Sequence, residues 1–222
     1  MRIGVLSLQG AFQEHLQALA DLSDLSPFGA LRTGSLGRRL RVEAVAVRLP
    51  RQLRELAGLI IPGGESTTIG KLATLYNLLP AIEDMARNGL PIWGTCAGLI
   101  LLAREIVGYQ EQPRLRLLDV TVRRNAFGRQ VDSFQTLLSL PVLDEVATPA
   151  EHSRPFPAVF IRAPVIEKVG AGVTVLATLA DGSVVAVQQG QLLATSFHPE
   201  LTSDRRFHRY FLSLAADRQQ WA

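Results

Sequence analysis

Apolar and polar residues alternate along the first hundred positions in a pattern that predicts strands followed by helices. Short apolar runs of strand length occur at Ile3–Leu8, Val42–Val47, Leu59–Ile61 and Pro91–Thr95. The segments after them carry apolar residues at helical spacing, over Ala11–Leu22, over Glu65–Asn88 with a break near Asn77–Pro80, and over Ala97–Ile106. This alternation is typical of a mostly parallel sheet with helices on both faces.

The second half of the chain has a different pattern, in which predicted strands follow one another. They cover Leu118–Val122, Ser133–Leu140, Ala158–Ile161, Val173–Ala180, Ser183–Gln188 and Gln191–Ser196. Asp181-Gly182 between two of them is a hairpin signal. A final helix is predicted over about Asp204–Ala216. We therefore expect one α/β domain over residues 1–222, with antiparallel strands added to a parallel sheet. The segment Ser23–Arg41 is rich in glycine and proline and is expected to be a loop or excursion.

Composition narrows the class of protein. The longest apolar stretches, such as Leu99–Ala103, are far too short to cross a bilayer, and the first residues lack the pattern of a secretory signal. The single cysteine excludes an internal disulfide and fits a reducing compartment. We expect a cytoplasmic protein without a membrane partner.

Charge gives little indication of nucleic-acid binding. The net charge is only +3, and Arg38, Arg39 and Arg41 form the densest basic cluster. No aromatic residues interleave this cluster and no binding motif surrounds it, so a solvated surface segment is the better interpretation.

The sequence Gly94-Thr95-Cys96-Ala97-Gly98 follows a predicted strand and begins a predicted helix. Small residues on either side of a nucleophile allow the sharp turn that exposes its side chain above a sheet. A helix N-terminus favours the reactive thiolate, and the N–H of Ala97 can face a developing oxyanion. The alternative is a buried structural cysteine, which is common for a lone cysteine.

A cysteine nucleophile needs a base and a group that orients the base. Of the four histidines, His198 alone follows the end of a predicted strand, as Cys96 does, so the two can meet at one edge of the sheet. Glu200 follows two residues later, beyond a proline, and can hold the imidazole. The alternative is an ordinary surface turn.

A third loop, Pro62–Thr68, places two glycines between a strand and a helix. It lacks the G-K-[ST] ending of a phosphate loop, and Glu65 would repel a phosphate. A second oxyanion donor from Gly64 fits the cysteine chemistry better, although a helix cap explains Glu65, Ser66 and Thr67 without any ligand.

Six ordered segments together resemble one enzyme family. They are Leu8–Gly10, Pro62–Thr67, Gly94–Leu99, Arg124–Phe134, Phe160–Pro164 and Ser196–Leu201. The chain resembles the class I, triad-type glutamine amidotransferases and, within them, the glutaminase subunits of two-component pyridoxal 5′-phosphate synthases. The match is poor in Ser23–Arg41, which looks like an insertion, and the loop Glu145–Pro157 looks longer than the family pattern.

The resemblance implies roles for matching residues. Cys96, His198 and Glu200 would form the triad, and the N–H groups of Gly64 and Ala97 the oxyanion hole. Glutamine would be bound by Gly64, Glu65, Ser66, Arg124, Ile161 and Arg162. The fork of an arginine suits the substrate carboxylate, although Arg124 can also be read as a solvated charge. Gln9 is either a residue supporting the oxyanion hole or a turn residue.

The resemblance also implies a three-layer, flavodoxin-like amidotransferase fold and hydrolysis of L-glutamine to glutamate and ammonia through a thioester. It implies no metal or organic cofactor. The partner would be a synthase subunit that forms a large ring, with glutaminase subunits docked on its outside and activated there. Three alternatives stay open: a glutaminase for another biosynthetic synthase, a non-catalytic binding or regulatory module, and a different cysteine hydrolase on a related sheet.

Overall fold

One ten-stranded mixed sheet forms the centre of the protein in the computed structural model, which describes residues 1–24, 41–124 and 133–219. Its strands are β1 (Arg2–Leu6), β2 (Glu43–Val47), β3 (Gly58–Ile61), β4 (Ile92–Thr95), β5 (Ala103–Ile106), β6 (Leu118–Arg123), β9 (Val165–Val169), β10 (Thr174–Thr178), β11 (Val184–Gln189) and β12 (Leu192–Thr195). They lie in the order β2-β1-β3-β4-β12-β11-β9-β6-β5, and β10 pairs with β11. A separate pair joins β7 (Ser133–Leu138) to β8 (Phe156–Ile161).

The direction of the strands changes partway across the sheet. β2, β1, β3, β4 and β12 are parallel neighbours, whereas β11 is antiparallel to β12, β9 and β10. The predicted parallel sheet with antiparallel additions is confirmed. Because the carboxyl ends of β3, β4 and β12 meet at one edge, the loops after these strands are brought together there.

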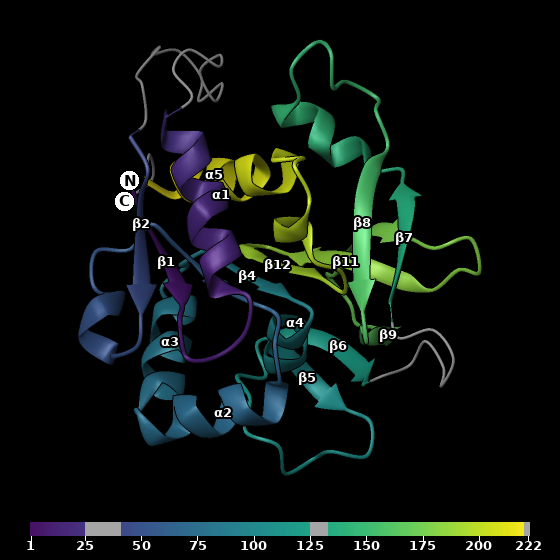
Figure 1. The fold of residues 1–222 in the computed structure, drawn as a ribbon. Coiled ribbons are helices and arrows are strands. Elements are labelled where there is room, and N and C mark those ends of the chain that lie inside the picture. The colour runs from purple at the N-terminus through teal and green to yellow at the C-terminus, as the bar shows by residue number, and fades with distance from the viewer. Residues whose placement is uncertain (25–40, 125–132, 220–222) are drawn as a thin grey trace.

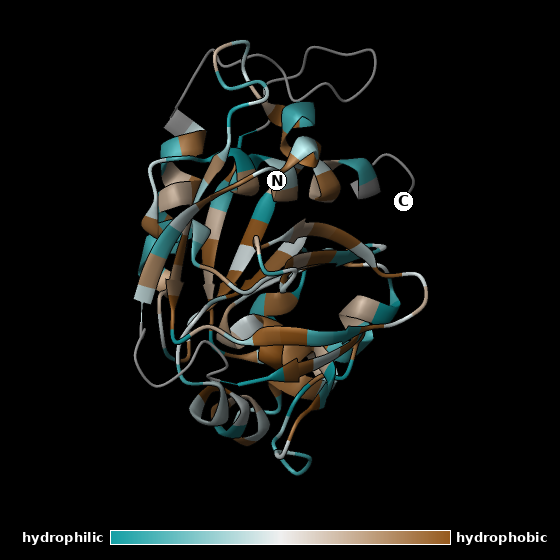
Figure 2. Cartoon of the chain, turned by 90° about the vertical axis from the view of Figure 1, so that its right-hand side faces the viewer, coloured by the Kyte–Doolittle hydropathy of each residue, from teal (hydrophilic) through white to brown (hydrophobic). Residues whose placement is uncertain are grey.

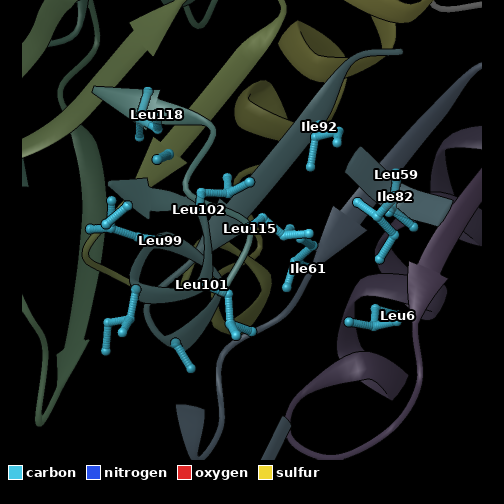
Figure 3. Packing of buried hydrophobic residues seen from close by; sticks show 14 of the residues in the cluster. Leu6, Leu59, Ile61, Ile82, Ile92, Leu99, Leu101, Leu102, Leu115 and Leu118 are labelled. Atoms are coloured by element: carbon cyan, nitrogen blue, oxygen red, sulfur yellow. The ribbon is translucent and has the colours of Figure 1, made fainter. Parts of the chain in front are cut away.

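Helices cover both faces of the sheet (Figure 1). They are α1 (Phe12–Asp24), α2 (Ser66–Leu75), α3 (Leu78–Arg87), α4 (Ala97–Leu102) and α5 (Arg206–Gln219), with 3₁₀ turns η1 (Pro50–Leu53), η2 (Pro141–Val146) and η3 (Pro199–Leu201). One core cluster packs α2, α3 and α4 on the sheet through residues such as Ile82 and Leu101 (Figure 3). The other packs α1 and α5 through residues such as Leu19 and Phe211. The strands between the two clusters are short and largely apolar, as a sheet buried on both faces requires (Figure 2).

Two element predictions need correction. The helix predicted over Ala97–Ile106 ends at Leu102, and Ala103–Ile106 forms β5, paired with β6. A short apolar run does not distinguish a buried helix from a strand. Here the segment forms a strand because β6 is available to pair with it. The strand β9 was not predicted; it pairs with β6 and β11. The predicted helix break is confirmed, since Asn77 takes a left-handed conformation (φ 54°) between α2 and α3.

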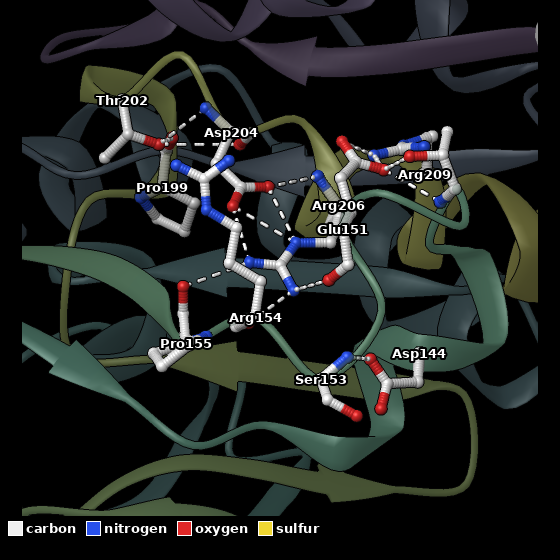
Figure 4. A network of polar contacts seen from close by, with 11 residues as sticks. Asp144, Glu151, Ser153, Arg154, Pro155, Pro199, Thr202, Asp204, Arg206 and Arg209 are labelled. Carbon is white, nitrogen blue, oxygen red and sulfur yellow. Dashed lines mark hydrogen bonds and ion pairs between the residues drawn. The ribbon is translucent and has the colours of Figure 1, made fainter.

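A buried arginine fixes the segment after η2 (Figure 4). The guanidinium of Arg206 donates to the carboxylate of Asp204 and to the backbone carbonyls of Glu151, Arg154 and Pro155. These hydrogen bonds hold much of the segment Glu145–Pro157 against the start of α5. This is the segment that looks longer than the family pattern. A cavity of about 300 Å³ opens beside it, and its lining includes neither Cys96 nor His198.

Two predicted segments lie partly outside the described residues: positions 25–40 of the insertion, with two of the three clustered arginines, and positions 125–132. No helix in the described ranges is long and apolar enough to span a membrane.

Candidate active site

Cys96 and His198 follow neighbouring parallel strands. β4 pairs with β12 in a register that places Thr95 opposite Thr195. The N–H of Cys96 donates to the carbonyl of Thr195 at 2.8 Å, and the N–H of His198 donates to the carbonyl of Val159 in β8 at 2.8 Å. The sheet therefore places the thiol and the imidazole at one edge, as the sequence predicted.

Close packing of the backbone explains the glycines around Cys96. Cys96 itself has φ 48° and ψ −100°, a strained conformation typical of a nucleophile at a sharp turn. A Cβ on Gly94 would lie 2.5 Å from the carbonyl carbon of Gly98, and one on Gly98 would lie 2.0 Å from the carbonyl oxygen of Ile61. Only glycine fits at either position, and the two glycines therefore allow the sharp turn between β4 and α4.

The three predicted triad side chains adjoin one another, with His198 between Cys96 and Glu200. Glu200 Oε1 is 2.7 Å from His198 Nδ1, and the side chain of Glu200 is fully buried. Burial would lower the pKa of His198, but hydrogen bonds with Cys96 and Glu200 and the negative charge of both partners outweigh it and raise that pKa to about 10. Burial would raise the pKa of Glu200, and its contacts with His15 and His198 lower it instead. The arrangement favours a carboxylate beside an imidazolium at neutral pH.

The loop after β3 lies against this pair. A Cβ on Gly63 would lie 2.3 Å from His198 Cε1 and 3.3 Å from Cys96 Cβ. The carbonyl of Gly63 accepts from the N–H of Ala11 at 3.0 Å, and Gln9 Oε1 accepts from the N–H of Glu65 at 2.7 Å. Because a trans peptide is planar, the N–H of Gly64 points away from the Gly63 carbonyl and thus away from Ala11. The hydrogen bond between Gln9 and the backbone of Glu65 holds this loop in place beside Cys96 and His198.

Glu65 caps helix α2 and also contacts Arg124. Its carboxylate accepts from the N–H of Thr68 at 2.7 Å and from Arg124 Nη2 at 3.0 Å. Burial would raise the pKa of Glu65, but hydrogen bonds from Thr67 and Thr68 outweigh it and lower that pKa to about 2. The helix cap expected from the sequence is present.

Arg124 is not a solvated charge. Its side chain is only 16% exposed, Nη1 donates to Gln112 Oε1 at 2.8 Å, and the guanidinium lies 4.6 Å from the ring centroid of Tyr109. Gln112 and Tyr109 were not among the predicted residues, because neither belongs to a motif. These contacts hold the guanidinium fork at the edge of the loop Pro62–Thr68, called the Glu65 loop below.

The remaining predicted residues border Cys96 or the Glu65 loop. The Cys96 thiol lies 3.9 Å from the carbonyl of Ile161, and Arg162 follows with φ 42°. Ser66 is buried at the start of α2, and its hydroxyl has no hydrogen-bond partner among the described residues. The described ranges hold no group of three or more histidine, cysteine or carboxylate side chains that could bind a metal.

Sequence reasoning missed two buried histidines behind the triad. His15 in α1 and His208 in α5 are fully buried, and their ring nitrogens lie 3.1 Å apart. Their position on the apolar faces of two predicted helices was the available signal. Burial lowers the pKa of each to about 3, although for His15 the charge of Glu200 opposes this.

These pKa values predict acid sensitivity of the fold. An unfolded histidine binds a proton near pH 6.5, whereas folded His15 and His208 stay neutral to about pH 3. The unfolded state therefore binds more protons in that window, and each histidine should lower the free energy of unfolding by about 2 kcal/mol from pH 7 to pH 5. Urea unfolding at both pH values should show a smaller fall for H15Q/H208Q than for the unchanged chain. His152→Gln, at a 63% exposed side chain, is the control. Equal pH dependence in all three proteins would contradict the prediction.

Comparison with known proteins gives one consistent result. The model of the "SNO glutamine amidotransferase family" matches residues 5–216. The chain is 53% identical over 218 residues to "Pyridoxal 5′-phosphate synthase subunit PdxT" of Dehalococcoides mccartyi, covering 98% of each chain. It is 54% identical over 216 residues to the protein of that name from Herpetosiphon aurantiacus, covering 96% of this chain and 100% of the relative.

Solved structures agree. The chain superposes on a crystal structure described as a glutamine amidotransferase with a TM-score of 0.81 at 48% identity, covering 96% of this chain and 98% of the other. A structure of PurLQS from Thermotoga maritima shares the fold, with a TM-score of 0.63 at 17% identity and 97% of each chain covered.

Proposed function

The chain belongs to the SNO glutamine amidotransferase family, and from this premise we propose that it hydrolyses L-glutamine to L-glutamate and ammonia through a thioester on Cys96. The observation that carries the proposal is the chain of Cys96, His198 and Glu200 at the ends of two adjacent parallel strands. The relatives' name supports delivery of the ammonia to a synthase subunit that makes pyridoxal 5′-phosphate.

The chemistry begins when His198 takes the proton of the Cys96 thiol, or with the pair already present as thiolate and imidazolium. The sulfur attacks the side-chain amide carbon of glutamine, and the negative charge that develops on the amide oxygen is stabilised by the N–H groups of Gly64 and Ala97. His198 then donates its proton to the departing nitrogen, and ammonia leaves. Water, deprotonated by the same histidine, hydrolyses the thioester and releases glutamate. Glu200 keeps Nδ1 protonated in each step and stabilises the ring whenever it is cationic.

Glutamine would lie between Cys96 and the loop that follows β3. Gly64, Glu65 and Ser66 would contact it from this loop, where the hydroxyl of Ser66, without a partner among the described residues, could form a hydrogen bond. Ile161 and Arg162 would complete the site on the side where the Ile161 carbonyl faces the thiol. Arg124 would bind the α-carboxylate, since its guanidinium is already held in place.

Arg124→Met is expected to raise the KM for glutamine about 10- to 100-fold and to change kcat little. The estimate corresponds to losing one hydrogen bond between charged groups, worth about 1.5–3 kcal/mol. Steady-state glutamate release measures it. Arg123→Met is the matched control, because the neighbouring Arg123 pairs with Glu167 at a 52% exposed side chain. A KM that rises equally in both variants would contradict the assignment.

The partner would be a ring-shaped synthase that carries glutaminase subunits on its outside, and the reaction would take place in the cytoplasm, in keeping with the single cysteine. Ammonia and glutamate release should be measured for the purified chain alone and with the synthase subunit of the same organism. Release that requires the partner supports both catalysis and activation by docking. Release without the partner supports the glutaminase activity but contradicts activation by docking. No release in either case, with complex formation confirmed, refutes the proposal.

A further inference from the structure

A continuous set of buried polar side chains extends from the triad into the protein interior. The two oxygens of Glu200 face different histidines: Oε1 lies 2.7 Å from His198 Nδ1, and Oε2 lies 3.3 Å from His15 Nε2. The side chains of His15 and Glu200 are both fully buried. Among the described residues, Oε2 has no well-aligned hydrogen bond, so the His15 ring is the polar group that it contacts. A buried carboxylate oxygen is costly without such a donor.

The surrounding groups determine which nitrogen of His15 carries its proton. His15 Nε2 also lies 3.3 Å from the hydroxyl of Thr95. That hydroxyl accepts from the N–H of Gly63 at 3.0 Å, and a hydroxyl can serve Nε2 either as donor or as acceptor. The carboxylate oxygen of Glu200 can only accept, so a neutral His15 ring faces it without repulsion when Nε2 carries the proton.

His208 completes the assignment. With Nε2 protonated, Nδ1 of a neutral His15 is an acceptor, and His208 Nε2 at 3.1 Å must donate to it. His208 Nδ1 is then a bare acceptor, in keeping with its lack of a partner among the described residues. In this assignment His208 donates to His15, and the N–H of His15 lies between the hydroxyl of Thr95 and the carboxylate oxygen of Glu200. Trp93 packs edge-on against both rings, with centroids 5.5 Å from His15 and 5.1 Å from His208.

We propose that His15 is a positioning residue for the glutaminase reaction, which holds the carboxylate of Glu200 toward His198, and that His208 fixes the ring tautomer with which His15 does so. This inference rests on the proposed function. The other charged groups near the pair are His198 and Arg205, and Arg205 forms an ion pair with Asp21 at 2.8 Å. Because Arg205 is already paired, the N–H of His15 remains the group in contact with Oε2.

The test compares two substitutions of different reach. His15→Gln can place an amide N–H near the position of Nε2, whereas the shorter His15→Asn cannot. We expect H15N to lower kcat about 10- to 100-fold, the usual loss when an outer partner of a functional side chain is removed, with KM within about twofold. The acidic limb of the pH profile of kcat/KM should move to higher pH, because Glu200 becomes easier to protonate. H15Q should recover most of kcat and the original limb, and H208F should shift the limb in the same direction as H15N.

Trp93→Phe is the matched control for packing, since Trp93 contacts both rings and its indole nitrogen has no hydrogen-bond partner among the described residues. It should leave the acidic limb in place. All assays use the complex with the synthase subunit.

A second readout does not require glutamine. Cys96 is the only cysteine, so the rate of alkylation by iodoacetamide reports on this thiol alone. The acidic limb of the alkylation rate should shift in H15N and not in H15Q or W93F. If the unchanged complex releases no glutamate, the proposed function fails and the alkylation profiles alone decide this inference. Unchanged profiles in H15N, or a loss of kcat that H15Q shares without any shift of either limb, would overturn it.

Discussion

Replacing Cys96 with alanine should abolish glutamate and ammonia release from glutamine, by at least about 10⁴-fold and to the background rate. The sulfur forms the bond to the substrate carbon, and no other thiol exists in the chain to replace it. The geometry leaves little room for another nucleophile, because the strained turn at φ 48° presents this one side chain to His198. Coupled measurement of ammonia and glutamate determines the loss.

The controls for Cys96→Ala separate chemistry from folding. The variant should bind glutamine and the synthase subunit as the unchanged chain does, because alanine fits wherever cysteine fits. Mass spectrometry of the acid-quenched unchanged complex should show a glutamine-derived acyl group that the variant lacks. Turnover by the variant above background would mean that Cys96 is not the nucleophile.

Glu200→Gln should lower kcat by about 10³- to 10⁴-fold, with little change in KM. The glutamine amide has nearly the shape of the carboxylate, but it carries no charge to stabilise the imidazolium and can present an N–H to His198 Nδ1. It then favours the wrong tautomer of the base, which costs about this much in other triads. The raised pKa of His198 depends partly on the hydrogen bond and charge of Glu200. In the variant that pKa should fall toward its ordinary value, and histidine NMR across a pH titration measures the change.

Glu83→Gln is the matched control for Glu200→Gln, since Glu83 lies in α3 and pairs with Arg87 at the surface. It should keep full activity. An E200Q variant with nearly normal kcat would show that the carboxylate contributes only to folding. The pH dependence of unfolding gives an independent check: a histidine with a folded pKa near 10 contributes stability that is complete below pH 6.5 and is lost as pH rises toward 10. This loss should be smaller in E200Q.

Local pattern was enough to predict the sheet and the turn at Cys96. Apolar runs of strand length followed by helical spacing predict parallel strands, and the carboxyl ends of such strands share an edge. Cys96 and His198 each follow one of these strands, and β4 and β12 are indeed neighbours. The glycines at positions 94 and 98 could be read as requirements of a sharp turn, because that requirement is local to the chain.

Contacts between distant segments were not predictable in this way. Whether Ala103–Ile106 continues a helix or forms β5 depends on β6, which lies beyond a connecting loop. From the sequence, Arg124 could be either a glutamine-binding residue or a solvated charge, and only its contacts with Glu65, Gln112 and Tyr109 excluded the solvated charge.

The sequence by itself predicted most of the order of strands and helices, Cys96 as the candidate nucleophile and the pairing of His198 with Glu200, since each depends on residues close together in the chain or on strand ends. Only the tertiary structure decided that His15 and His208, 193 positions apart, meet behind Glu200. Their hydrogen bond depends on how α1 and α5 pack on the same face of the sheet. Periodicity in the sequence can place each histidine on an apolar helix face, but it does not show that the two faces meet.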